Sequence, residues 1–123
     1  MDAKQLYFSI NGRISRSTFW LKFVLPVFII SILVNIIAGM VMGGDPNNPN
    51  PAGFALIGVW QLFLIYPSIC VYGKRWHDRD KSAWWILIGL IPFIGWIWVL
   101  VECGFLKGTD GPNRFGEDPV PAA

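Results

Sequence analysis

Lys74-Arg75-Trp76-His77-Asp78-Arg79-Asp80-Lys81-Ser82-Ala83-Trp84-Trp85 separates two long apolar runs of the chain. This stretch places four cations, two carboxylates and the single histidine beside three tryptophans. Tryptophan rings and Lys or Arg side chains gather where a transmembrane segment leaves the lipid, because they favour the boundary with water. The stretch therefore predicts a loop at a membrane surface, and the apolar runs on either side of it predict membrane spans.

The composition of the whole chain supports this interpretation. Of the 123 residues, 54% are hydrophobic and 15% are charged, and the mean hydropathy is +0.47. A soluble globular domain has about 25% charged residues. We therefore expect an all-α, multipass transmembrane protein that forms a single membrane-embedded domain over residues 1–123.

Three apolar runs are long enough to cross a bilayer, which takes about 20 residues. They cover residues 19–42, 52–73 and 83–106, and a polar tail follows at 107–123. Ser15 is placed to cap the first helix, and the connector at 43–51 is rich in Gly, Pro and Asn, which form turns. A cleavable secretory signal is the alternative for the first run, but no convincing small-residue cleavage site follows it.

The third run allows two structures. A single helix over residues 83–106, kinked by Pro92 and Gly95, would cross the bilayer with some tilt. The segment from Pro92 to Gly95 could equally form the turn of a re-entrant hairpin, in which each arm is too short to cross alone. We expect the single helix, with Glu102 near the far membrane boundary, where it is solvated or paired with Lys107.

The distribution of cations predicts the orientation, because Lys and Arg in short loops favour the cytoplasmic side. Four cations precede or enter the first run, none lies between the first and second runs, and four follow the second. We therefore expect the N-terminus and the 74–82 loop to be cytoplasmic, and the connector to face outward. With a single third helix the tail is also outside. Cys70 and Cys103 would then lie near opposite faces of the bilayer, so we expect two free thiols rather than a disulfide.

Two sets of residues are candidates for interactions. Small and polar side chains within the spans let helices approach and form hydrogen bonds in lipid, and the candidates are Ser31, Asn35, Gln61 and Ser68. Cations and their neighbours at the cytoplasmic boundary form a candidate docking surface for anionic lipid head groups or a partner, and these are Arg13, Arg16, Lys74, Arg75, His77, Asp78, Arg79 and Lys81. An equally good interpretation is that the cations only enforce the orientation.

His77 and Asp78 could also be considered as a catalytic base and its carboxylate. Adjacent side chains rarely orient one another in this way, and no nucleophile motif, metal-ligand spacing or phosphate-binding glycine loop accompanies them. We therefore expect no enzymatic activity, no cofactor and no nucleic-acid partner. Instead, we expect both side chains to close the turn by hydrogen bonds to the backbone or to Arg75 and Arg79.

Four motifs follow one another along nearly the whole chain. They are Gly12-Arg13-Ile14-Ser15-Arg16 with Phe19-Trp20; Arg75-Trp76-His77-Asp78 with Lys81-Ser82-Ala83-Trp84-Trp85; Ile91-Pro92 with Gly95; and Gly108-Thr109, Gly111, Asn113-Arg114-Phe115-Gly116 and Asp118-Pro119. In this order and spacing they resemble domain-of-unknown-function family 805, a family of small bacterial inner-membrane proteins. Trp76 stands where the family more often has leucine, and Ala83 where it often has glycine. The resemblance implies a multipass protein of the bacterial inner membrane and supplies no activity.

Two classes of function fit these features. A membrane interaction, accessory or scaffold protein, working as a homo-oligomer or with a larger membrane protein, needs only polar packing faces and a distinctive cytoplasmic surface. A subunit of an oligomeric transporter or channel is the alternative, and it needs polar residues along a pathway. Asn35, Gln61 and Glu102 are the candidates for that role, and we find no internal repeat of the kind that transporters use. We therefore expect an interaction protein.

Overall fold

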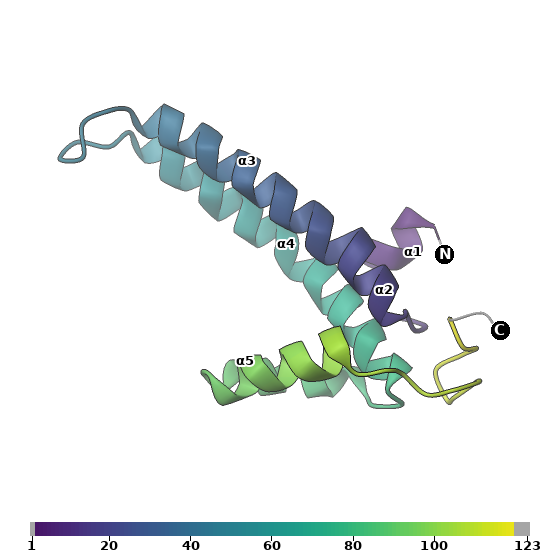
Figure 1. Ribbon diagram of the computed structural model, residues 1–123. Coiled ribbons are helices and arrows are strands. Elements are labelled where there is room, and N and C mark those ends of the chain that lie inside the picture. The colour runs from purple at the N-terminus through teal and green to yellow at the C-terminus, as the bar shows by residue number, and fades with distance from the viewer. Residues whose placement is uncertain (1, 120–123) are drawn as a thin grey trace.

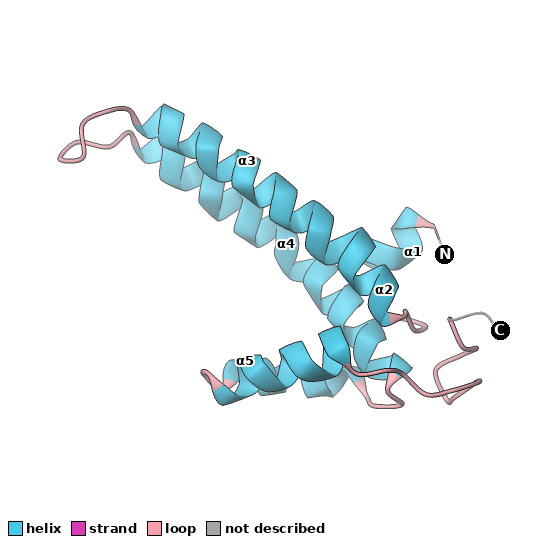
Figure 2. Ribbon diagram, in the orientation of Figure 1, coloured by secondary structure: helices cyan, strands magenta, loops and turns pink. Residues whose placement is uncertain are grey.

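The computed structural model describes residues 2–119, so residues 120–123 of the predicted tail lie outside the described range. Within that range the chain consists of helices and loops without a β-strand (Figure 2). Two long antiparallel helices form one hairpin, and two short helical arms form a second hairpin, which meets the first at the end away from its connecting loop (Figure 1). The all-α fold class predicted from the sequence is confirmed.

The first long helix runs from Arg16 to Met42 and is apolar enough to cross a membrane. It consists of α2 (Arg16–Phe19), a π-helical turn (Trp20–Val24) and α3 (Leu25–Met42). Ser15 caps its first turn by accepting a hydrogen bond from the Thr18 amide. Pro26 has no amide proton to donate to the carbonyl four residues earlier. That carbonyl, of Lys22, instead accepts a hydrogen bond from the Tyr7 hydroxyl, which ties the helix to the short α1 (Ala3–Phe8).

The second long helix, α4, runs from Pro51 to Asp78 and also has the length and composition of a membrane span. It packs along α3, and the two helices come close at Gly53, where an added Cβ would lie 2.7 Å from the Ala38 carbonyl oxygen. Further along the same seam, the Trp60 indole donates a hydrogen bond of 2.8 Å to the Ser31 hydroxyl. Ser31 thus takes part in helix packing and Ser68 is half-buried, whereas Asn35 and Gln61 are exposed.

The prediction of a single helix over residues 83–106 is wrong. A 3₁₀-helix (Ala83–Leu90) leads into a turn at 91–93, and the chain then returns through α5 (Ile94–Val99) and a second π-helical segment (Leu100–Phe105). Pro92 lacks the amide needed to continue a helix. Gly95 lets the arms meet, because an added Cβ would lie 1.9 Å from the Ile88 carbonyl oxygen. Each arm spans about 16 to 18 Å, which is too short to cross a bilayer.

The hairpin changes where the end of the chain lies. The tail contacts the N-terminal segment directly, since Arg13 donates hydrogen bonds to the carbonyls of Thr109 and Gly111. The tail therefore lies at the same end of the long hairpin as the N-terminus, and the prediction that it lies on the opposite side is wrong. The connector between α3 and α4 forms the other end (Figure 1).

Both cysteines are free thiols, as predicted, and both are buried. The reason given for that prediction does not hold, however. Cys103 was expected near the far face of the membrane, but its backbone carbonyl accepts a hydrogen bond from Arg75 in the last turns of α4. The return of the second hairpin brings Cys103 to the end of the molecule that carries the charged residues.

Candidate functional site

The charged stretch that was predicted as a loop is largely helical. α4 continues through Asp78, and the loop that follows is only four residues long, from Arg79 to Ser82. As a result, Lys74, Arg75 and Asp78 lie on the end of a long helix, where they pack against the N-terminal segment and the returning tail. All three are buried, with exposed fractions of 0% for the two cations and 3% for Asp78.

The Asp78 carboxylate lies at the centre of this cluster and binds two arginines. Its Oδ1 accepts from Arg13 Nε at 2.9 Å, and its Oδ2 accepts from Arg75 Nη1 at 2.7 Å. The Asp78 main-chain carbonyl also accepts a bond of 2.7 Å from the Thr109 amide. Two buried cations therefore share one buried anion, an arrangement that is stable only when the remaining N–H groups also find acceptors.

The remaining N–H groups of the two arginines donate to main-chain carbonyls from separate parts of the chain. Arg13 donates to Thr109 at 2.6 Å and to Gly111 at 2.7 Å in the tail. Arg75 donates to Ile14 at 2.8 Å, to Leu106 at 2.9 Å and to Cys103. We call Arg13, Arg75 and Asp78 the buried triad. It joins the N-terminal segment, the end of α4, the end of the second hairpin and the tail.

His77 is held in place by hydrogen bonds and by ring stacking. Its Nδ1 is 2.9 Å from the Gly12 carbonyl oxygen and therefore carries the proton of that hydrogen bond. Its ring stacks on Phe115 with the centroids 3.9 Å apart, and its main-chain carbonyl accepts from the Asn113 amide group. The Asp78 carboxylate is bound to the two arginines, so His77 and Asp78 do not form a base and orienting acid. The predicted bonds of His77 to the backbone and of Asp78 to Arg75 are present, but the other partners, Gly12 and Arg13, lie in the N-terminal segment and not in the turn.

A second charged group lies where the two hairpins meet. Lys81 donates to both oxygens of Glu102, at 2.7 and 2.9 Å, and Arg79 lies 3.9 Å from the same carboxylate. The predicted pairing of Glu102 with Lys107 is wrong: Lys107 pairs with Asp110, whose hydrogen bond and charge raise the pKa of that lysine. Glu102 thus binds the second hairpin to the loop after α4.

The candidate docking surface is therefore mostly internal. Five of its eight residues are buried and bonded within the chain, and these are Arg13, Lys74, Arg75, His77 and Asp78. The predicted head-group or partner contacts of these five are wrong, because the side chains do not reach the surface. Arg16, Arg79 and Lys81 remain at least partly exposed, although each also has a partner in the chain.

Sequence reasoning missed the acceptors of this site, since they are main-chain carbonyls and carry no side-chain signature. The glycines of the tail motif were the available indication. An added Cβ at Gly108 would lie 1.9 Å from an Asp78 carboxylate oxygen. Gly111 and Gly116 have φ of 74° and 138°. Residues with a side chain rarely adopt such values. Within residues 2–119, no three His, Cys, Asp or Glu side chains are grouped so as to hold a metal ion.

Comparison with known proteins identifies the family of this chain. A family model described as "Protein of unknown function (DUF805)" matches residues 7–117. Inner membrane protein YhaH of Escherichia coli K12 is 33% identical over 116 residues, covering 92% of this chain and 88% of that protein. Inner membrane protein YhaI of the same strain is 32% identical over 113 residues, covering 92% and 87%. No solved structure matches significantly.

The matched region contains the buried triad and every segment that the triad joins. Its relatives are named as inner membrane proteins, and the two long apolar helices of this chain agree with that location. This chain is therefore a membrane protein and belongs to the DUF805 family of proteins of unknown function.

Proposed function

We propose that this protein is a membrane-embedded interaction protein that works without catalysis and associates through its long hairpin, with a second copy as the partner. One observation carries the proposal: two amide side chains in the spanning helices lack partners on the neighbouring helix. The Asn35 amide donates only to the Ser31 carbonyl of its own helix. Gln61 is exposed and makes no side-chain hydrogen bond to any residue in the range 2–119.

An unpaired amide in a membrane span favours association, because lipid chains offer it no hydrogen bond. Bonds between Asn or Gln side chains on neighbouring spans stabilise helix contacts by about 1 kcal/mol each. Little of the long hairpin is buried within the chain. In the most apolar 18-residue stretch of each of its two helices, only 6% and 17% is buried. Most of its surface is thus available to lipid or to another helix.

Asn35 and Gln61 lie on the same flank of the hairpin. Ser31 and Trp60 face each other across the seam. Asn35 follows Ser31 by one helical turn, and Gln61 follows Trp60 directly. Because the helices are antiparallel and each turns by about 100° per residue, these offsets place both amides on one side of the seam, about 8 Å apart in depth. In two copies with the same orientation, a twofold axis along the membrane normal keeps each residue at its own depth. Each amide could therefore pair with its counterpart in the second copy, Asn35 with Asn35 and Gln61 with Gln61.

The buried triad supports this function by holding the rest of the chain in place. The N-terminal segment, the tail and the second hairpin are bonded to the end of α4 through groups that are already satisfied. The end of the long hairpin is thereby fixed without using the surfaces of α3 and α4. A rigid end with two lipid-facing helices suits a protein that acts by binding within the membrane.

The test is the association of the purified protein in detergent and in bilayers. We expect the double variant Asn35→Leu, Gln61→Leu to weaken self-association about tenfold or more, because the two amide pairs of the dimer, each worth about 1 kcal/mol, are both removed. The measurement is the energy transfer between donor- and acceptor-labelled chains as the ratio of protein to lipid is varied.

The matched control replaces Ile37 and Val59, two exposed apolar residues of the same helices, by leucine. It should associate like the original protein. A monomeric original protein, or a double leucine variant that associates as well as the control, would contradict pairing through these amides. Recovery of one larger membrane protein with the original chain but not with the leucine variant would keep the interaction role and replace the second copy by that partner.

We further infer that the end bearing the buried triad lies on the cytoplasmic side. Four cations of the N-terminal part and four at the end of α4 gather there, together with Lys107 and Arg114 of the tail, while the connector carries none. Cations in short segments next to a span favour the cytoplasm. The connector would then face the periplasm.

This orientation can be checked by labelling intact cells with a membrane-impermeant thiol reagent. Cysteine introduced at the exposed residue Asn48 should react, whereas cysteine at Lys4 or Asp110 should be protected until the cells are opened. The original chain is the background, since Cys70 and Cys103 are buried. Labelling at only one of Lys4 and Asp110 in intact cells would refute the shared side of N-terminus and tail, and labelling at both would reverse the orientation.

A further inference from the structure

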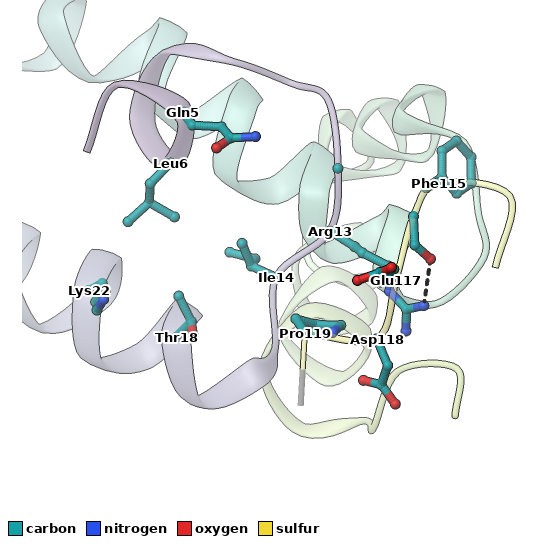
Figure 3. A pocket seen from close by; sticks show the side chains of 12 residues that line it. Gln5, Leu6, Arg13, Ile14, Thr18, Lys22, Phe115, Glu117, Asp118 and Pro119 are labelled. Atoms are coloured by element: carbon teal, nitrogen blue, oxygen red, sulfur yellow. Dashed lines mark hydrogen bonds between the residues drawn. The ribbon is translucent and has the colours of Figure 1, made fainter. Parts of the chain in front are cut away.

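Two cavities of opposite character meet at Lys22, next to the start of the first long helix. A polar cavity of about 550 Å³ lies between α1, the start of the long helix and the tail, and includes Thr18 and Glu117 in its lining (Figure 3). An apolar groove of about 320 Å³ runs along α3 and α4 beneath Tyr7 and Phe8 of α1. Lys22 lines both.

The two cavities have the shape of a binding site for an amphipathic molecule. Bound head-group atoms would lie at the polar end, and an apolar chain would follow the groove towards Ile30 and Trp60. Ile30 is eight residues beyond Lys22, so the groove reaches about 12 Å along the helix. α1 separates the two parts, with Gln5 and Leu6 on the polar side and Tyr7 and Phe8 on the apolar side.

The charges of the polar cavity indicate which head group fits. The Lys22 ammonium has no ion-pair partner among residues 2–119. Thr18 lies one turn before it on the same face of the helix. Together they offer a cation and a hydroxyl donor to a phosphate. The Glu117 carboxylate lines the same cavity and also has no ion pair within that range. A purely anionic head group would be repelled by Glu117, whereas a primary ammonium would bind it.

We propose that these two cavities form one binding site for a zwitterionic aminophospholipid. The phosphate would bind Lys22 and Thr18, the primary ammonium would bind Glu117, and one acyl chain would occupy the groove between α3 and α4. This site lies on the flank of the hairpin away from Asn35 and Gln61, which line neither cavity. The proposal is therefore independent of the self-association proposed above.

The test is native mass spectrometry of the full chain in a mild detergent, titrated with three phospholipids that share the same acyl chains. Phosphatidylethanolamine should bind about tenfold more tightly than phosphatidylcholine, whose ammonium has no N–H to donate, and than phosphatidylglycerol, whose head group is anionic. Lys22→Gln should lower phosphatidylethanolamine affinity about tenfold. Glu117→Gln should remove the preference over the other two lipids. Val27→Trp, which fills the groove, should weaken the binding of all three.

The matched controls are Lys4→Gln and Asp45→Asn, exposed residues outside both cavities, and neither should change the affinity. Glycerophosphoethanolamine has the head group without acyl chains and should compete only weakly. Equal retention of the three lipids, a preference for phosphatidylglycerol, or an unchanged affinity in Lys22→Gln would overturn the proposal. Equal competition by glycerophosphoethanolamine would overturn the use of the groove.

Discussion

Asp78→Ala is expected to lower the free energy of unfolding by about 3 to 5 kcal/mol. This is the usual range when one member of a buried ion pair is removed and its partner remains. Here the loss leaves the guanidinium groups of Arg13 and Arg75 buried without an anion, at 4% and 0% exposure. Their main-chain acceptors remain but do not carry a full charge. Chemical unfolding in mixed detergent micelles, followed by tryptophan fluorescence, measures the change.

The matched control is Asp80→Asn, two residues further along. Asp80 also binds an arginine, since its carboxylate lies 3.2 Å from Arg114, but both side chains are about half exposed or more. The backbone φ of Asp80 is 59°, and asparagine tolerates this positive value. An exposed pair contributes about 0.2 to 1 kcal/mol, so this variant should change stability little. If Asp78→Ala lost no more than Asp80→Asn, the triad would not be what holds the four segments together.

The membrane spans were accessible from the sequence because their signals are local. Length, hydropathy and the Ser15 cap are each read from neighbouring residues, and the structure has both long helices near the expected positions. The prediction for the third apolar run was wrong because its local signals do not determine the structure. Its hydropathy is compatible with one helix or with two arms, and what decides between them is a contact between arms, the approach of Gly95 to the Ile88 carbonyl.

The prediction of an exposed docking surface was wrong because the burial of its charges depends on contacts between distant residues. Seven ionisable side chains in nine residues are typical of a solvated surface, and nothing local shows that Asp78 meets Arg13, which is 65 residues away. Burial of such charges requires acceptors, and the two arginines find them in the carbonyls of Ile14, Cys103, Leu106, Thr109 and Gly111. Any residue type supplies a carbonyl, so composition and spacing could not have revealed them. The glycines of the tail were the sequence feature that indicated this close packing.

Gly108→Ala is the substitution that most directly tests this close packing. The added methyl group would lie 1.9 and 2.6 Å from the two Asp78 carboxylate oxygens and 2.2 Å from the carboxyl carbon. The carboxylate cannot move aside, because Arg13 and Arg75 hold both of its oxygens. The tail must therefore shift, and overpacking of this kind costs about 1 to 3 kcal/mol. Gly44→Ala is the matched control, since an added Cβ there has no neighbour within 4 Å.

Limited trypsin digestion after the exposed Lys107 measures how often the tail leaves its site. When opening is fast compared with cleavage, the cleavage rate follows the open population, so a cost of about 1.4 kcal/mol should raise it about tenfold. Gly44→Ala should leave the rate unchanged. An unchanged rate in Gly108→Ala would mean that the tail does not pack on Asp78.

The same measurement in the Asp78→Ala background separates a steric effect from a conformational one. Removing the carboxylate removes the atoms that the new methyl group would meet, so Gly108→Ala should then add much less than it does in the original chain. The two changes should therefore cost less together than the sum of their separate costs, as expected for residues in direct contact. If the costs were simply additive, the glycine would be needed for its backbone flexibility and not for the space it leaves beside Asp78.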